Sequence, residues 1–136
     1  MAASVLVDAG FLVALIYRPD RHHRWAAAKA ERFPPPWVTC EAVVSEAFHL
    51  LDIRGRAALV GVLRRRAVIS VFRLDEDTEQ VLRLMEKYAD VPMSFADGCL
   101  VRMTEKLPDP VLLTTDSDFR VYRRNSRQAI PCEIPD

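Results

Sequence analysis

Four carboxylates stand at positions where acidic side chains could act together. Asp8 interrupts the apolar run VLVDAGFLVALIY, and Asp116 follows the apolar segment VLLTT. Glu46 falls on or beside the apolar face of a predicted helix, and Asp97 opens another predicted helix in the segment MSFADGCL. Two ionised carboxylates about 5 Å apart repel each other by roughly 3 kcal/mol at an effective dielectric constant of about 20. Such a cluster therefore requires either protonated groups or a cation at its centre.

Each aspartate also has an ordinary structural role open to it. Asp8 precedes a predicted helix and is a favoured N-cap residue. Asp116 lies in TTDSDF, where Asp and Ser commonly begin turns. Asp97 follows Ser94 with the spacing of a capping box. For each aspartate taken alone, the sequence does not decide between the structural role and a functional one. A fold that brings all four acids to one edge favours a shared function.

The ligand chemistry favours a hard divalent cation. Carboxylate oxygens without neighbouring His or Cys suit Mg²⁺ or Mn²⁺ rather than zinc, and the three histidines form no HExxH pattern. Mg²⁺ keeps several water ligands and binds through one or two carboxylates together with substrate phosphate oxygens. Phosphodiester hydrolysis uses this arrangement. We therefore expect Mg²⁺ or Mn²⁺ as the cofactor.

Short apolar strands alternate with helices along the chain. This alternation predicts an α/β fold, a three-layer sandwich in which helices flank a central, mostly parallel β-sheet. Functional residues gather beyond the carboxyl ends of such strands, so Asp8 and Asp116 are predicted neighbours. The predicted strands are 4–7, 36–39, 67–72, 111–114 and 129–133, and the predicted helices are 9–17, 21–32, 40–52, 55–66, 76–89 and 95–106.

The composition is that of one globular domain, which we place at residues 1–136. Its 19 basic and 19 acidic residues cancel, so no global charge attracts nucleic acid. The basic residues are almost all arginines, and arginine binds phosphate bidentately. Solvated helix faces explain the arginine clusters equally well. The clusters are Arg64, Arg65 and Arg66, and Arg120, Arg123, Arg124 and Arg127.

The sequence shows no sign of a membrane or secretory protein. No apolar run approaches the roughly 20 residues of a membrane helix, and no signal-peptide pattern is visible. A cytoplasmic protein is therefore expected. Cys40, Cys99 and Cys132 are widely separated and lack the spacing of a zinc site, so we expect three reduced thiols.

The acids lie in motifs that resemble the PIN (PilT N-terminal) domain, and more narrowly the VapC-type toxins of bacterial and archaeal toxin–antitoxin pairs. The resemblance runs through essentially the whole chain. It rests on VLVDAGFLVALI at the N-terminus, TxExxxSE at 39–46, SFADGCLV at 94–101 and LLTTDSDF at 112–119. No acidic position of the motif is missing.

The resemblance implies a PIN-like domain with metal-dependent endoribonuclease activity, in which the Thr114 hydroxyl supports the acids. Hydrolysis would leave 5′-phosphate and 3′-hydroxyl ends, and arginines of the two clusters would contact flanking phosphates. Single-stranded RNA from tRNA, rRNA or mRNA is the implied substrate. A small VapB-like antitoxin and a second copy of the chain, in a homodimer, are the implied partners. The implied metal ligands are Asp8, Glu46, Asp97 and Asp116, with Asp118 as an occasional fifth.

Two other functions fit parts of this pattern. A non-catalytic PIN-like module could bind RNA or protein, and it would gain no stability from Mn²⁺. A receiver-like phosphoacceptor domain also gathers acids around Mg²⁺ at strand ends. It requires a lysine after a late strand, and none of Lys29, Lys87 and Lys106 follows a predicted strand. The nuclease is therefore the first hypothesis.

Overall fold

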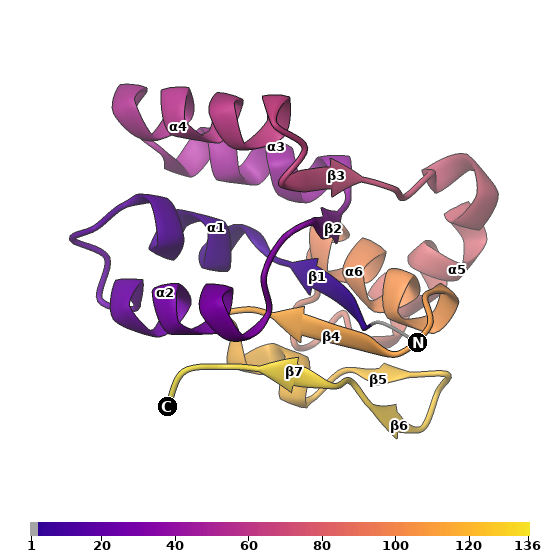
Figure 1. The fold of residues 1–136 in the computed structure, drawn as a ribbon. Helices are drawn as coiled ribbons and strands as arrows, with labels where there is room; N and C mark the ends of the chain where they lie inside the picture. The colour runs from indigo at the N-terminus through magenta and orange to yellow at the C-terminus, as the bar shows by residue number, and fades with distance from the viewer. Residues whose placement is uncertain (1–2) are drawn as a thin grey trace.

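A parallel sheet forms the centre of the molecule (Figure 1). The computed structural model describes residues 3–136. The strands of this sheet are β1 (Ser4–Val7), β2 (Trp37–Thr39), β3 (Val68–Ser70), β4 (Pro110–Leu113) and β7 (Cys132–Glu133). They lie in the order β3-β2-β1-β4-β7, and each pairs with its neighbours in parallel. The predicted α/β fold with a central parallel sheet is therefore confirmed.

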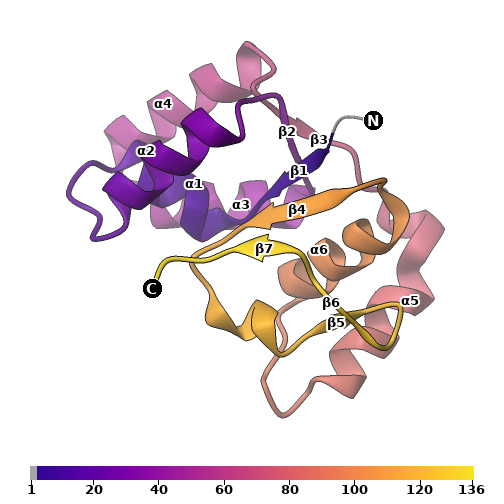
Figure 2. The same cartoon turned by 60° about the horizontal axis from the view of Figure 1, so that its bottom comes forward.

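Helices cover both faces of the sheet. They are α1 (Ala9–Ile16), α2 (His23–Arg32), α3 (Glu41–Leu50), α4 (Ile53–Arg64), α5 (Leu74–Lys87) and α6 (Phe95–Lys106). In Figure 2, α1, α2 and α4 lie on one side of the sheet, and α5 and α6 lie on the other. Helix α3 contacts both α1 and α6. Within residues 3–136 no helix has the length and apolar character needed to cross a membrane.

The central strands are buried because helices cover both of their faces. Val7 ends β1 and Leu113 ends β4; both are fully buried, and they pair opposite each other. The chain continues from these residues into Asp8 and Thr114. The register therefore brings two polar residues to the same point of the carboxyl edge of the sheet.

The segment after β4 differs from the prediction of one last strand at 129–133. It contains the 3₁₀ helix η1 (Ser117–Arg120) and the antiparallel hairpin of β5 (Arg123–Arg124) and β6 (Gln128–Ala129), and only then β7. Asn125 and Ser126 turn the hairpin with positive φ values of 49° and 69°; Asn adopts this conformation readily. The other elements begin and end within about two residues of the predicted ranges, which is the usual uncertainty of such boundaries.

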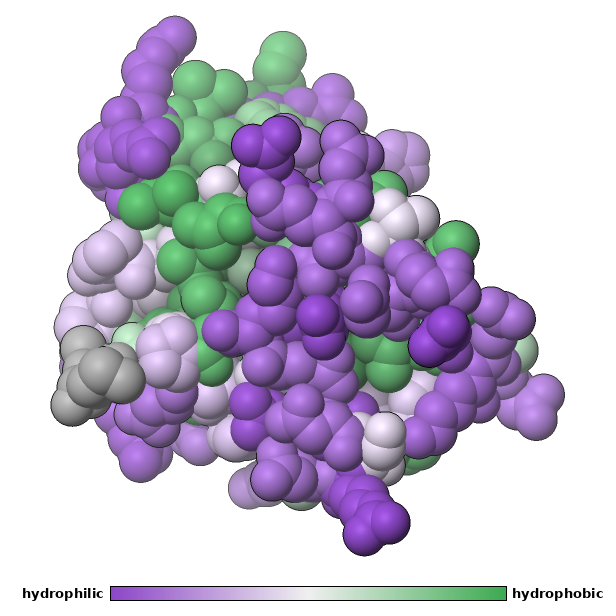
Figure 3. All heavy atoms as spheres, turned by 90° about the vertical axis from the view of Figure 1, so that its right-hand side faces the viewer, coloured by the Kyte–Doolittle hydropathy of each residue, from purple (hydrophilic) through white to green (hydrophobic). Residues whose placement is uncertain are grey.

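The connection from β3 to α5 leaves apolar side chains exposed. Val71 is 46% exposed and Leu74 is 36% exposed. Figure 3 views the side of the molecule on which α5 lies and shows apolar side chains gathered between polar ones. Single exposed apolar residues are ordinary, whereas a group of them marks a surface for a ligand or partner.

Candidate active site

Asp8 is buried at the junction between β1 and α1, with 7% of its surface exposed. Its Oδ1 accepts from the backbone N–H of Ala9 at 2.7 Å, so it caps α1 as the local sequence suggests. Burial raises the pKa of Asp8 from 3.8 to about 7, and the negative charges of Asp97 and Glu46 act in the same direction. Capping and a place in an acidic cluster are therefore compatible roles.

Thr114 ties Asp8 to the segment after β4. This threonine is fully buried, and its hydroxyl donates to Asp8 Oδ2 at 2.8 Å while accepting from the backbone N–H of Asp116 at 3.0 Å. One hydroxyl thus connects the ends of two neighbouring strands. These are the contacts expected of a residue that supports the acids.

Asp116 caps the start of η1, and its negative charge acts on two neighbouring acids. Its Oδ1 accepts from the backbone N–H of Asp118 at 2.9 Å, which is the turn role open to it in the sequence. Its charge raises the pKa of both Asp97 and Glu46. Asp118 is half-buried one turn further along and contributes its backbone to this cap.

Asp97 completes the capping box of α6. Its Oδ2 accepts from the backbone N–H of Ser94 at 3.1 Å, and the Ser94 hydroxyl accepts from the backbone N–H of Asp97 at 3.0 Å. Burial raises the pKa of Asp97, with the hydrogen bond from Ser94 opposing this and the charge of Asp116 adding to it. Both side-chain hydrogen bonds of Asp97 fall on Oδ2, which leaves Oδ1 for a ligand.

Tyr122 is a site residue that the sequence does not reveal. Its hydroxyl donates to Asp97 Oδ2 at 3.2 Å, and its ring is fully buried against Tyr88 and Phe119, with ring centroids at 5.1 Å and 5.2 Å. Burial and the charge of Asp97 raise the pKa of Tyr122, so the hydroxyl keeps its proton. Apolar spacing alone indicates a buried ring here, but not its hydrogen-bond partner.

Glu46 differs from the prediction in its exposure. The sequence places it on or beside the apolar face of α3, whereas the structure has it exposed on that helix. Partial burial nevertheless raises the pKa of Glu46, and the charges of Asp97 and Asp116 raise it further. Glu46 therefore lies at the rim of the acidic group rather than inside it.

Mutual repulsion links these four acids into one group, which we call the carboxylate cluster (Asp8, Glu46, Asp97 and Asp116). The charges of Asp97 and Glu46 raise the pKa of Asp8. The charge of Asp116 raises the pKa of both Glu46 and Asp97. Across residues 3–136 no Lys, Arg or His forms a salt bridge with any member. Among the described residues, the cluster is thus a group of acids that no basic side chain pairs with.

The donor atoms fit a hard divalent ion, but they are not assembled into a ligand set. In the part of the chain that the structure describes, no group of three or more His, Cys, Asp or Glu side chains is arranged to hold a metal ion. The structure of residues 3–136 therefore does not show the predicted four-ligand arrangement already assembled, and that arrangement stays a prediction. Mg²⁺ binds through only one or two carboxylates and fills its remaining positions with water and phosphate oxygens, so the chemistry of the cluster still suits it.

The arginine cluster at 64–66 does not lie with the acids. These residues are exposed and precede β3, so they stand at the amino edge of a parallel sheet whose carboxyl edge carries the carboxylate cluster. Arg64, which ends α4, and the following Arg65 and Arg66 therefore lie at the opposite edge of the sheet from a phosphate bound between the acids.

The arginines after Asp116 are divided between structural and open positions. Arg123 donates to the backbone oxygens of Arg120 and Tyr122 at 2.7 Å and 3.1 Å. Arg124 donates from Nε to the backbone oxygen of Thr104 at 3.1 Å, and from Nη2 to the same atom. Arg120 is exposed and lies in the 3₁₀ turn that follows the cluster. Of this set, Arg120 is the best placed to meet a phosphate.

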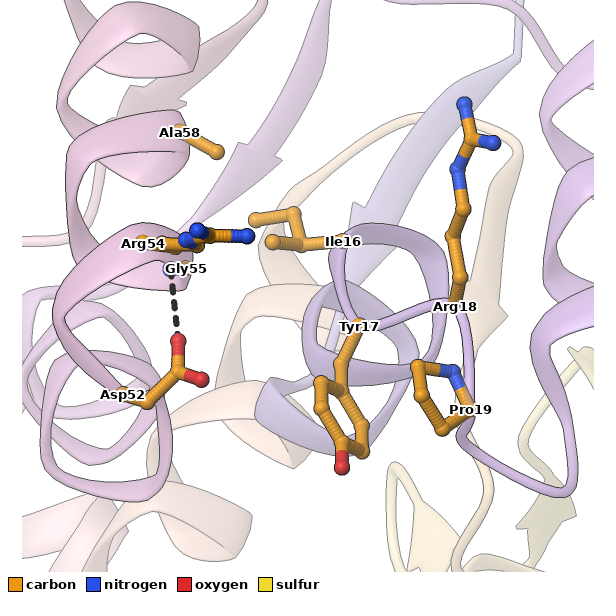
Figure 4. Close-up of a pocket in the computed structure, with 8 residues that line it drawn as sticks. All are labelled: Ile16, Tyr17, Arg18, Pro19, Asp52, Arg54, Gly55 and Ala58. Carbon is orange, nitrogen blue, oxygen red and sulfur yellow. Dashed lines mark hydrogen bonds between the residues drawn. The ribbon is translucent and has the colours of Figure 1, made fainter.

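A cavity of about 390 Å³ lies away from the carboxylate cluster (Figure 4). It is formed between the end of α1 and the start of α4, where Asp52 accepts from the backbone N–H of Gly55 at 2.8 Å and caps α4. None of the predicted site residues lines it. Its lining residues are Ile16, Tyr17, Arg18, Pro19, Asp52, Arg54, Gly55 and Ala58. The carboxylate cluster therefore lies at the carboxyl edge of the sheet and not in this larger space.

A comparison with protein families places these features in a known context. The model of a family described as the PIN domain matches residues 5–125. The match spans every member of the carboxylate cluster together with Thr114 and Tyr122. A comparison with curated proteins finds no match.

Proposed function

The chain belongs to the PIN domain family, and from this premise we propose that it is a Mg²⁺- or Mn²⁺-dependent endoribonuclease. PIN domains are generally nucleases and typically use divalent metal ions. The observation that carries the proposal is the state of Asp8. Burial and neighbouring acids raise the pKa of this carboxyl to about 7, and among residues 3–136 no Lys, Arg or His forms a salt bridge with it. A buried group with a strongly shifted pKa at the edge of a sheet is a candidate functional group.

In this proposal the four acids of the cluster bind the ion, and neighbouring residues hold the acids and the substrate in position. Asp8, Glu46, Asp97 and Asp116 would hold the ion, with Asp118 beside them. When bound, a divalent ion activates a water and neutralises charge on the phosphate. Thr114 fixes the orientation of Asp8, and the capping box fixes that of Asp97. Arg120 would bind a phosphate that flanks the scissile bond.

We further propose that the chain acts as the toxin of a VapBC-type pair. The motifs of the sequence support this role. So does the lack of a paired Lys, Arg or His at the carboxylate cluster within residues 3–136. An arginine on a segment of a small VapB-like antitoxin would complement the cluster and exclude the metal. The active form would be a cytoplasmic homodimer. Purification from the native source tests for the antitoxin, because a small, tightly bound protein should accompany the chain.

Cleavage of RNA tests the nuclease proposal. The wild type should cleave single-stranded RNA with Mg²⁺ or Mn²⁺ and not with EDTA, and should leave 5′-phosphate ends. Asp8→Asn and Asp97→Asn should each lower the cleavage rate on the order of 10³-fold. Each variant removes a carboxylate that would hold the ion, and the ion would stabilise the charge of the transition state. Asp90→Asn is the matched control, since Asp90 is exposed and outside the cluster. Undiminished cleavage by both cluster variants would overturn the proposal.

A non-catalytic PIN-like module that binds RNA or protein is the second candidate. The observation that favours it is the absence of an assembled metal-binding group within residues 3–136. Such a module should show no rise in melting temperature with Mn²⁺ and should bind RNA without cleaving it. Metal titration therefore separates the two functions.

A further inference from the structure

A small apolar pocket opens beside the carboxylate cluster. Its volume is about 150 Å³. Cys40 directly follows β2, Phe72 follows β3, and Phe95 begins α6, so the pocket stands at the carboxyl edge of the sheet. Its lining also includes Glu41, Leu74 and Cys99.

Two connections join this pocket to the cluster. Phe95 and Asp97 share the first turn of α6. On the other side, the Thr39 hydroxyl donates to the backbone oxygen of Val7 at 2.8 Å, so the ends of β2 and β1 are bonded together. Cys40 and Asp8 are the next residues of those two strands. The pocket and the cluster are therefore both built from the first turn of α6 and from adjacent strand ends at the carboxyl edge of the sheet.

The pocket exposes apolar side chains that the core does not use. Phe95 is 40% exposed and Leu74 is 36% exposed, although both are large and apolar. An aromatic ring left open to solvent beside a charged cluster contributes little to folding. It does offer a flat face to a ligand, and unstacked bases of single-stranded RNA bind to such faces.

We propose that this pocket holds one unstacked base of a single-stranded RNA, next to the phosphate that is cut. The inference rests on the proposed endoribonuclease function and adds a subsite to it. Phe95 stacks on the base, and Phe72 and Leu74 enclose it. The small volume suits a single base rather than a larger ligand.

Glu41 gives the pocket one polar wall. It is exposed in the first turn of α3 and lines the pocket. A carboxylate accepts hydrogen bonds and donates none, so it favours a base that presents an exocyclic amino group. Adenine, cytosine and guanine carry such a group, whereas the Watson–Crick donor of uracil, N3–H, lies between two carbonyl oxygens that repel a carboxylate. The subsite should therefore disfavour uracil.

Short labelled RNAs of defined base composition test the subsite. Binding is measured by fluorescence anisotropy in EDTA, and cleavage is measured with Mg²⁺. Phe95→Ala should raise Kd and KM about 5- to 150-fold, equivalent to stacking of about 1–3 kcal/mol, with little change in kcat. Phe95→Tyr should keep wild-type values, and Glu41→Gln should reduce the discrimination against uracil. Tyr17→Ala is the matched control, because Tyr17 is an aromatic residue 46% exposed beside the other cavity.

The outcomes separate this inference from the function on which it rests. If the wild type neither binds nor cleaves RNA, both fail. If the wild type cleaves with Mg²⁺, Asp97→Asn does not, and Phe95→Ala keeps the wild-type KM and cleavage pattern, the subsite alone is wrong. If Phe95→Ala weakens binding of a partner protein and not of RNA, the occupant is a protein side chain and the inference is also wrong.

Discussion

Asp77 and Asp8 are both almost fully buried aspartates, with exposed fractions of 2% and 7%. Asp77 accepts from Arg102 Nε at 2.9 Å and from Lys106 Nζ at 2.7 Å. Burial acts to raise the pKa of Asp77, but these bonds and charges hold it below its ordinary value. Within residues 3–136, Asp8 accepts only from Thr114 and Ala9, and burial raises its pKa to about 7.

The difference separates a structural carboxylate from the one that we propose to be functional. A buried carboxylate is costly unless it is paired. Helix α6 supplies two cations to Asp77, which lies on α5, and the described residues 3–136 supply none to Asp8. Asp8 instead has other acids as neighbours, which only an external cation can offset. The lack of a cationic partner at a buried acid, rather than burial alone, therefore points to the proposed site.

The pH dependence of stability should have opposite signs in the two regions. Asp8 has an ordinary pKa of 3.8 and a folded-state pKa of about 7, so between these values the folded protein holds a proton that the unfolded chain has released. In the metal-free protein the free energy of unfolding should fall as pH rises through this window, by about 4 kcal/mol at most. The raised pKa values of Glu46 and Asp97 act with the same sign. Asp77 stabilises above its ordinary pKa of 3.8 and loses this as pH falls through its lowered value.

Urea denaturation in EDTA at stepped pH measures this slope. Asp8→Asn should flatten the fall in stability between about pH 4 and 7, because the amide does not titrate in that window. Asp90→Asn should leave the slope unchanged. A wild type whose stability is constant across the window would contradict the burial of an unpaired Asp8.

Removing a cation from Asp77 should be strongly destabilising. Arg102→Met leaves the buried carboxylate with one cation and should cost about 3 kcal/mol in the free energy of unfolding. Arg83→Met is the control, because Arg83 pairs with Glu79 at 3.2 Å on the exposed surface of α5. That change should cost no more than about 0.5 kcal/mol. Equal costs for the two variants would mean that the Asp77 pair contributes no more than a surface pair.

Mn²⁺ should stabilise the wild type and distinguish the two regions again. At a concentration about 100 times its Kd the ion should add about 2.7 kcal/mol to the free energy of unfolding. Asp8→Asn and Asp97→Asn should lose this gain, since each removes a carboxylate of the cluster. Arg102→Met should keep the full gain although it is less stable. Thermal unfolding with and without Mn²⁺ measures all four proteins, and an equal gain in the cluster variants would place the ion elsewhere.

The parts of the site that follow directly from strand ends are predictable from sequence. Asp8 and Thr114 follow apolar runs, and parallel strands with helical connections must end at one edge. Arg64–Arg66 illustrate the limit, because their composition suggests phosphate binding while their place before β3 puts them at the opposite edge. Glu46 is another, since helical periodicity places it beside an apolar stripe but does not determine its exposure.

Contacts between distant segments are less predictable. The hydrogen bond from the Arg124 guanidinium to the backbone oxygen of Thr104 depends on how the β5-β6 hairpin packs on α6. No periodic pattern in the sequence encodes this packing. The contact of Tyr122 with Asp97 has the same origin. Such contacts arise from tertiary packing, and sequence patterns describe local structure.

Tyr122→Phe should produce the smallest effect and gives the sharpest test of how the cluster is held. The variant keeps the packed ring and removes the hydrogen bond to Asp97 Oδ2. Losing one such bond costs about 1 kcal/mol, so the Mn²⁺ concentration needed for half-maximal cleavage should rise about fivefold. Tyr88→Phe is the matched control, because the Tyr88 hydroxyl accepts from the backbone N–H of Arg123 at 3.1 Å in the same aromatic group. Both variants should lose similar stability, but only Tyr122→Phe should change the metal dependence. If both shift it equally, Tyr122 acts through packing and does not position Asp97.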